Sequence, residues 1–146
     1  MSKYMKGDYV IHLLSRTRDR IQKFLGRELE KQGIQDIAPA HAGVLFVLSK
    51  NGAMRMSELA TILDRTNSTA TALLDKMEEF GYVIRTKLDP DERVTTADLT
   101  EKGKRSVEKV IKASKITLNK LYKGLDETEK AEFVRLLSKI HANFEI

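Results

Sequence analysis

Cysteine is absent from this sequence of 146 residues. Without a thiol the chain can form no disulfide, can offer no thiolate nucleophile or thiol redox sensor, and cannot bind zinc through sulfur. Long apolar runs are also missing. No stretch approaches the ~20 residues needed to span a bilayer, and the first residues, MSKYMKGDY, contain no apolar segment like that of a secretory signal. We therefore expect a cytoplasmic protein with no membrane partner.

The signatures of catalysis and of cofactor binding are missing as well. There is no glycine-rich phosphate loop. The acidic pairs Glu78-Glu79 and Asp91-Glu92 are adjacent in sequence, so they do not suggest two carboxylates facing each other across a cleft. Histidine occurs three times, far apart and without the i, i+4 spacing of metal ligands, at His12, His41 and His141. Accordingly, the sequence predicts neither an enzyme nor a bound cofactor or metal.

Length and charge limit the number of domains and the kind of partner that this chain can have. A chain of this length with 41% hydrophobic residues can bury one ordinary core, so one domain, or one domain with an assembly element, is expected. The net charge of +5 suggests a polyanionic partner. The charge is unevenly placed, because residues 55–93 contain six basic and eight acidic residues, whereas 101–123 contain eight basic and two acidic ones. The second stretch could attract DNA at long range, and the alternative is a solvated helix face.

Long amphipathic helices are predicted at both ends of the chain. Apolar residues recur at helical spacing from about 8 to 31, with basic residues on the opposite side. Thr100 is the expected N-cap of another long helix, whose apolar residues fall within one arc. A last helix is expected from about Asp126 to Asn143, since Asp126-x-x-Glu129 resembles a capping box, and it should bury residues such as Phe133.

Between these ends, three shorter helices and two strands are predicted. The Ala38-Pro39 pair begins a helix that ends near Asn51-Gly52. A short helix follows with Ser57 as its expected N-cap, and the next covers about 67–80 after an N-cap at Thr66 or Asn67. The segments YVIRTKL and VTTADL then alternate like short strands around the turn LDPDERV. The expected fold class is therefore mainly α with a small β-hairpin (α+β).

This order of helix, helix, short loop, helix and two-stranded ribbon is the order that a winged helix-turn-helix needs. In such a unit the second helix of the pair enters a major groove, about 12 Å wide in B-DNA, and the ribbon lies beside it on the backbone or in a minor groove. The outward positions of the 67–80 helix would be Ser68, Thr71, Ala72, Asp75 and Lys76. Its inward positions would be Ala70, Leu73, Leu74, Met77 and Phe80. Small hydroxyl side chains can approach bases closely, although any surface helix can carry them.

Several short patterns together resemble the core of the MarR (multiple antibiotic resistance regulator) family. They are SELA at 57–60, STATALLDKME at 68–78, GYVIR at 81–85, DER at 91–93 and LTEKG at 99–103. Each pattern is weak alone, but their order and spacing are specific, and the long helices on both sides extend the resemblance over the whole chain. The resemblance implies a winged helix-turn-helix lobe at 38–100 and dimerisation helices at 8–32 and 101–146.

The resemblance also assigns a role to the charged turn LDPDERV. It implies that the wing spans 83–99, that Arg93 reaches into the minor groove, and that Asp91 fixes the direction of an arginine by pairing with it. Independently, a guanidinium suits a narrow electronegative groove, whereas Glu92 must point away from phosphate. The alternative is that Arg93 belongs to a solvated hairpin turn.

The chain departs from common family members at two positions that often carry a basic residue, Ala72 and Glu92. Without these two basic residues the DNA-binding surface carries less positive charge, so we expect modest and strongly salt-dependent DNA affinity. The residues expected to contact DNA are Arg55, Arg65, Asn67, Ser68, Thr69, Thr71, Lys76, Arg85, Lys87, Asp91 and Arg93.

The first and last helices need a partner, because one small chain would leave their apolar stripes incompletely covered. A symmetric homodimer covers them by isologous packing and places two reading helices about one DNA turn apart, so the DNA partner should be a pseudo-palindromic duplex. Interface residues are expected to be Val10, Leu13, Leu14, Phe133, Leu137, Ile140 and Phe144, unless some of them fill the core of the single chain.

The sequence thus predicts a homodimeric regulator of transcription that binds double-stranded DNA. By resemblance alone, it would be a repressor whose DNA affinity falls when a small-molecule effector binds between the lobe and the dimer helices, near Leu14, His41, Leu45 and Phe46. Three alternatives remain: a winged-helix module that binds protein and not DNA, a metal-responsive regulator, and, with least support, a cofactor-free enzyme that depends on His41.

Overall fold

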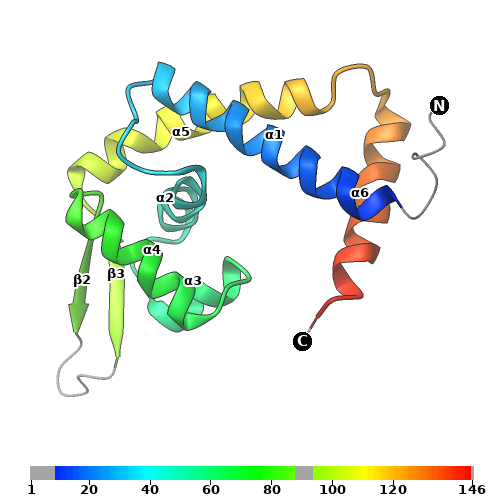
Figure 1. The fold of residues 1–146 in the computed structure, drawn as a ribbon. Coiled ribbons are helices and arrows are strands. Elements are labelled where there is room, and N and C mark those ends of the chain that lie inside the picture. The colour runs from blue at the N-terminus through cyan, green and yellow to red at the C-terminus, as the bar shows by residue number, and fades with distance from the viewer. Residues whose placement is uncertain (1–8, 88–93, 146) are drawn as a thin grey trace.

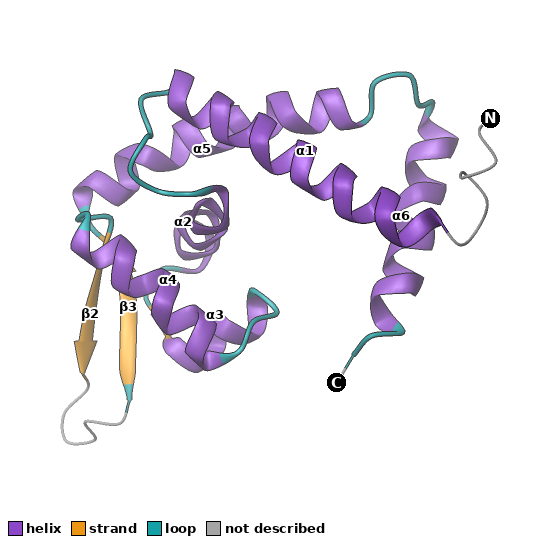
Figure 2. Cartoon of the chain, viewed as in Figure 1, coloured by secondary structure: helices purple, strands orange, loops and turns teal. Residues whose placement is uncertain are grey.

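The computed structural model describes residues 9–87 and 94–145. Its elements, in chain order, are α1 (Val10–Lys31), α2 (Pro39–Asn51), β1 (Met54–Arg55), α3 (Met56–Ile62), α4 (Asn67–Glu79), β2 (Val83–Lys87), β3 (Thr95–Leu99), α5 (Glu101–Leu121) and α6 (Glu127–Ala142). Figure 2 shows a mainly helical chain with a small antiparallel sheet. The expected fold class is confirmed.

Local capping explains where three of the helices begin. The hydroxyl of Thr66 accepts a hydrogen bond from the Thr69 N–H at 3.1 Å, and Thr100 caps α5 in the same way through the Gly103 N–H. At α6, Asp126 and Glu129 form the predicted reciprocal capping box. The predicted cap at Ser57 is wrong. Helix α3 starts one residue before Ser57, with Arg55 as its N-cap, because the chain enters it directly from β1.

The sheet has the strand order β1-β3-β2, with both neighbouring pairs antiparallel. Strands β2 and β3 pair from Val83 with Leu99 to Lys87 with Thr95, as a hairpin requires. Strand β1 has only two residues, and it holds the start of α3 against the sheet through the pairing of Met54 with Ala97. The hairpin therefore extends from a lobe that already contains α3 and α4 (Figure 1).

Helix α2 lies at the centre of the core. Figure 1 shows it nearly end-on, between α5 on one side and α3 with α4 on the other, and it packs against all three. The buried side chains of α2 include Val44, Leu45 and Leu48, none more than 1% exposed. They share one apolar cluster with Leu74 of α4 and Val110 of α5. This layering places α4 and α5 on opposite sides of α2.

The segment that follows α4 is hydrogen-bonded to the start of α5. Gly81 has a φ of 81°, which ends the helix and turns the chain into β2. The Thr100 hydroxyl donates a hydrogen bond of 2.5 Å to the Gly81 carbonyl, and the Thr100 N–H donates one to the carbonyl of Tyr82. A Cβ at Gly103 would collide with that same Tyr82 carbonyl oxygen. The threonine and glycine of LTEKG thus dock the end of one helix on the start of another.

Apolar side chains remain exposed on α1 and α6. Among the described residues, none of α6 is buried in the single chain. Exposed fractions range from 41% to 78% for the seven predicted interface residues, Val10, Leu13, Leu14, Phe133, Leu137, Ile140 and Phe144. The prediction that the last helix buries Phe133 and its neighbours is therefore wrong for the single chain, because α6 stands apart from the core (Figure 1). In the described part of the chain, no helix is both long and apolar enough to cross a membrane.

Candidate nucleic-acid interface

Helices α3 and α4 form a helix-turn-helix around a tight turn. Asp64 adopts a φ of 54° in this turn, and the Arg65 N–H bonds to the Ala60 carbonyl, so the chain reverses within a few residues. Helix α4 then buries Ala70, Leu74 and Met77, as its sequence predicts. Phe80 differs from the prediction. It lies just past the helix end and is 37% exposed, near the Nζ of Lys76.

The first turn of α4 presents small polar groups to solvent. Asn67, Ser68, Thr69 and Thr71 are all exposed. The hydroxyl of Thr69 is held by a hydrogen bond from Thr66, at 3.0 Å between the oxygens. The first N–H groups of a helix have no partner within the helix, and the positive end of its dipole favours anions. This turn is therefore suited to contact a phosphate or a base edge.

Four predicted basic residues surround this helix with exposed side chains: Arg55, Arg65, Lys76 and Lys87. They come from the end of β1, the α3–α4 turn, α4 and the end of β2, and both α3 and β2 pack against α4. Within residues 9–87 and 94–145, none of the four forms an ion pair with a carboxylate. As far as the described residues are concerned, each can therefore reach an external anion without breaking such a pair.

Arg85 differs from these four residues. Its Nη2 atom lies 2.6 Å from Asp75 Oδ1 and 3.1 Å from Glu78 Oε1, both on α4. The Glu78 carboxylate also accepts a hydrogen bond from the Arg85 backbone N–H at 2.9 Å. The hydrogen bonds from Arg85 lower the pKa of Glu78. Burial opposes the charged form of Arg85, but the bonds to Glu78 and Asp75 outweigh it and raise the pKa of the guanidinium.

Two predicted wing residues, Asp91 and Arg93, lie outside the described residues. Strands β2 and β3, which flank them, run side by side away from α5 (Figure 1). The hairpin and α4 belong to one lobe, joined by the Arg85 ion pairs and by the turn at Gly81.

The four residues predicted near an effector do not share one environment. Leu45 is fully buried in the core, and His41 is only 6% exposed. The Nδ1 atom of His41 accepts a hydrogen bond from the Ala38 N–H at 3.0 Å, and burial lowers the pKa of the imidazole. Leu14 and Phe46 are 44% and 45% exposed. None of the four lines any of three cavities formed by the described residues, at the α2–α3 junction, between the α3–α4 turn and the end of α6, and between α1 and α5.

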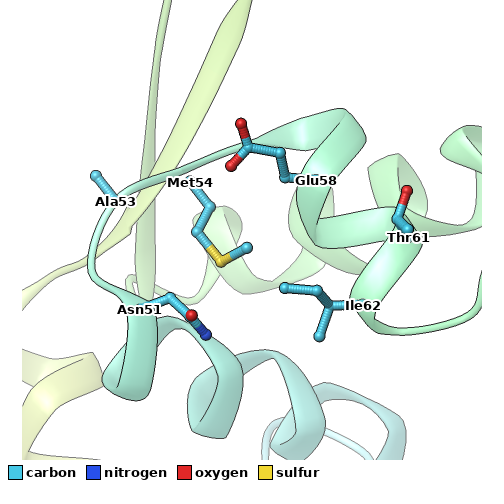
Figure 3. Close-up of a pocket in the computed structure, with 6 residues that line it drawn as sticks. All are labelled: Asn51, Ala53, Met54, Glu58, Thr61 and Ile62. Atoms are coloured by element: carbon cyan, nitrogen blue, oxygen red, sulfur yellow. The ribbon is translucent and has the colours of Figure 1, made fainter.

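The cavities lie elsewhere, and sequence patterns did not indicate them. One, of about 440 Å³, is bounded by the end of α2, β1 and α3, and Figure 3 shows Met54 pointing between Asn51 and Ile62 there. Another, of about 570 Å³, separates the α3–α4 turn from the end of α6. At its edge, His141 Nε2 lies 3.1 Å from Asp64 Oδ2. Both are open to solvent. The first is lined by residues between 51 and 62, whereas the second combines residues 60–66 with residues 141–145.

The histidines have separate surroundings. His141 faces Asp64, His41 bonds to the Ala38 backbone, and the ring of His12 lies 6.1 Å from that of Tyr9. In the part of the chain that the structure describes, no group of three histidine, aspartate or glutamate side chains could hold a metal ion.

A helix-turn-helix followed by a hairpin, with exposed cations around the second helix, defines a winged helix-turn-helix protein. Comparison with known proteins shows which winged helix-turn-helix proteins this chain is similar to. The model of the MarR family matches residues 37–95. The chain is 28% identical to the HTH-type transcriptional repressor IacR of Pseudomonas putida over 143 residues, covering 98% of this chain and 84% of that protein. It is 29% identical to the repressor MdtR of Bacillus subtilis over 121 residues, covering 83% and 76%.

Solved structures show the same fold. A mutant of MarR from Escherichia coli, complexed with operator DNA, superimposes with a TM-score of 0.80 at 22% identity, covering 96% of this chain and 99% of that chain. Over residues 37–95 the chain therefore matches the MarR family, and the two similar proteins named above are transcriptional repressors.

Proposed function

We propose that this protein is a homodimeric repressor that binds a pseudo-palindromic DNA duplex. The observation that carries the proposal is the exposed polar first turn of α4, surrounded by cationic side chains that have no carboxylate partner among the described residues. Its relatives IacR and MdtR are named transcriptional repressors, and the structurally similar MarR was crystallised with operator DNA. A dimer that occupies an operator can repress by excluding other proteins from that DNA.

Within this function, α4 is the reading helix. Asn67, Ser68 and Thr71 would meet base edges in the major groove, and the Thr69 hydroxyl would stay within hydrogen-bond reach of the cap. Arg55, Arg65, Lys76 and Lys87 would contact phosphates and set the register on the duplex. Arg93, with Asp91 orienting an arginine of the wing, would enter the minor groove. Base contacts then supply specificity, and phosphate contacts supply most of the affinity.

The dimer would use the exposed apolar residues of α1 and α6. Residues 8–32 and 101–146 would form the dimerisation region, and 38–100 the DNA-binding lobe. The exposure of Phe133, Leu137 and Ile140 supports this division, because a long apolar helix face left in water is costly. Two copies related by a two-fold axis would present two reading helices to successive major grooves.

A small-molecule effector would reduce affinity by favouring a spacing of the two reading helices that no longer matches the operator. Its site would lie between the DNA-binding lobe and the dimer helices. Of the four residues predicted near it, Leu14 and Phe46 offer exposed apolar surface, and Leu45 and His41 are buried.

The test is fluorescence anisotropy of labelled DNA taken from beside the protein's own coding region, over a series of salt concentrations. We expect binding that exceeds binding to an unrelated duplex and that falls steeply with salt. Arg93→Ala and Arg65→Ala should weaken it. Lys112→Ala removes the same charge from α5, across α2 from the reading helix, and should change it little.

Equal weak binding to every duplex, unaffected by Arg93→Ala, would contradict the proposal. A winged-helix module that binds protein would then account better for the fold.

A further inference from the structure

The reading helix has an unfavourable charge for its proposed task. Its second half carries Asp75, Glu78 and Glu79 against a single basic residue, Lys76. A helix that enters a major groove lies between two phosphate backbones, and like charges brought together there oppose binding. The helix therefore needs a compensating cation that comes from outside its own sequence.

Arg85 of β2 supplies that cation. Its guanidinium reaches across the α4–β2 turn and contacts both Asp75, at 2.6 Å, and Glu78, at 3.1 Å. Its side chain is 20% exposed, whereas those of Asp75 and Glu78 are 61% and 40% exposed. The carboxylates thus lie nearer the surface, and the arginine is the most buried of the three side chains.

The same contacts fix the angle between the wing and the reading helix. Glu78 accepts hydrogen bonds from both the backbone N–H and the guanidinium of Arg85, so one carboxylate holds the strand and its side chain. A charge-assisted pair of this kind is stronger and more directional than a neutral hydrogen bond. Since the wing and α4 must fit neighbouring grooves together, their relative angle affects binding directly.

A direct phosphate contact by Arg85 would require a different geometry. A phosphate contact needs a side chain that extends into solvent, as that of Lys87 does. Lys87 lies two residues further along the same strand, on the same face, and its side chain is exposed. Arg85 is instead turned toward α4. Releasing it to reach a phosphate would leave two carboxylates of the reading helix without their shared partner.

We infer that Arg85 is a positioning residue, which neutralises Asp75 and Glu78 and holds the wing against the reading helix, and that it does not serve as a phosphate contact. This inference rests on the proposed function and makes it more specific. It divides the cations around α4 into two kinds. The exposed ones contact DNA, whereas Arg85 neutralises carboxylates of α4 that would otherwise repel the phosphates.

A double-mutant cycle on operator affinity tests the inference. Arg85→Met keeps the apolar stem of the side chain and removes the charge. In the native background we expect operator binding to weaken by about tenfold, since contacting charges couple strongly. In the Asp75→Asn/Glu78→Gln background, the same substitution should weaken binding by less than about threefold. In that double-mutant background, Arg85→Met should leave the slope of log affinity against log salt concentration unchanged. Loss of a phosphate contact would instead lower the magnitude of that slope by about 0.9.

Lys87→Met is the matched control, because it removes one charge from the same strand face. It should weaken binding equally in both backgrounds. An equal loss for Arg85→Met in the two backgrounds, with the lower salt slope, would overturn the inference and make Arg85 a phosphate contact. Circular dichroism and thermal unfolding check that each variant folds, and Arg85→Gln replaces Arg85→Met if the latter does not. Should the unsubstituted protein bind no duplex specifically, the proposed function fails instead.

Discussion

The Tyr82 hydroxyl lies inside the lobe, where it donates a hydrogen bond of 2.5 Å to Asp36 Oδ1. Lys102 bonds to the other oxygen of Asp36 at 3.3 Å and to the Phe80 carbonyl at 2.7 Å, and its Nζ lies 4.3 Å from the centre of the Tyr82 ring. Burial and then the bond to Asp36 raise the pKa of Tyr82, so the phenol stays protonated. These side chains join the α1–α2 loop, the end of α4 and the start of α5.

Asp36 should make stability depend on pH in a predictable direction. Burial alone would raise its pKa, but hydrogen bonds from Tyr82 and Lys102 outweigh burial and hold the pKa below its ordinary value. A carboxyl whose pKa is lowered by folding contributes stability above its unfolded pKa, and the contribution is lost as pH falls through the folded pKa.

We therefore expect Asp36→Asn to lower the melting temperature at pH 7, with the difference from the unsubstituted protein shrinking below about pH 4. Thermal unfolding of both proteins at several pH values checks this. Asp19→Asn, on the exposed face of α1, is the control and should have little effect at any pH. A constant difference between pH 3 and pH 7 for Asp36→Asn would show that its charge contributes nothing.

At the scale of elements, the contact between the start of α5 and the segment that follows α4 depends on glycine at one helical position. Gly103 and Gly43 both lie inside helices, where alanine is normally favoured by about 0.5–1 kcal/mol. A Cβ at Gly103 would meet the Tyr82 backbone, whereas a Cβ at Gly43 would have its nearest contact at 3.7 Å, with a Leu63 methyl.

The same substitution should thus have opposite effects at the two sites. Gly103→Ala should destabilise the protein by about 1–3 kcal/mol, because the backbone of α5 or of Tyr82 must shift. Gly43→Ala should leave stability unchanged or raise it by up to about 1 kcal/mol. Urea unfolding at equilibrium measures both. The close approach inferred between α5 and Tyr82 is refuted if Gly103→Ala is as stable as Gly43→Ala.

The elements that the sequence predicted correctly are those determined by neighbouring residues. Caps such as Thr66 and Thr100 act within three residues, so their side chains are sufficient to place a helix start. Strand β1 was missed because its two residues form a strand only by pairing with β3, more than forty residues away. Ser57 was misplaced for the same reason, since the residues before it belong to that strand.

The candidate interface shows the same limit. Exposed cations could be predicted from amphipathic patterns, and Arg65, Lys76 and Lys87 are exposed as expected. The ion pairs of Arg85 could not be predicted, because they depend on the direction in which the chain leaves Gly81. The burial of Leu45 could not be predicted either, because it depends on α4 and α5, whose residues Leu74 and Val110 share one apolar cluster with it.

At the scale of the whole molecule, the isolated chain is incomplete. Helix α6 begins with a capping box and pairs Glu132 with Arg135 on its polar side, so it is built to be helical, yet it buries none of its described residues. Its apolar residues Phe133, Leu137 and Ile140 recur at helical spacing on one face. A second copy that covers this face would also fix the distance between the two reading helices.

Substitution on that face should therefore affect DNA binding without touching the lobe. Leu137→Glu places a charge in the proposed interface and should convert the dimer to monomer, because burying an unpaired charge is costly. Ala131→Glu adds the same charge on the opposite face of α6 and should leave the dimer intact. Sedimentation velocity measures the assembly, and anisotropy on full and half operators measures the consequence.

For the monomer, binding to the full operator should fall to the level of the half operator, since the two lobes would no longer be linked and the gain from linked binding is lost. Binding of a half operator should change little, because α4 and its surrounding cations lie in the lobe. If Leu137→Glu stays dimeric with unchanged operator affinity, the apolar face of α6 is not the interface. A monomer that keeps full affinity would instead show that one lobe reads the site alone.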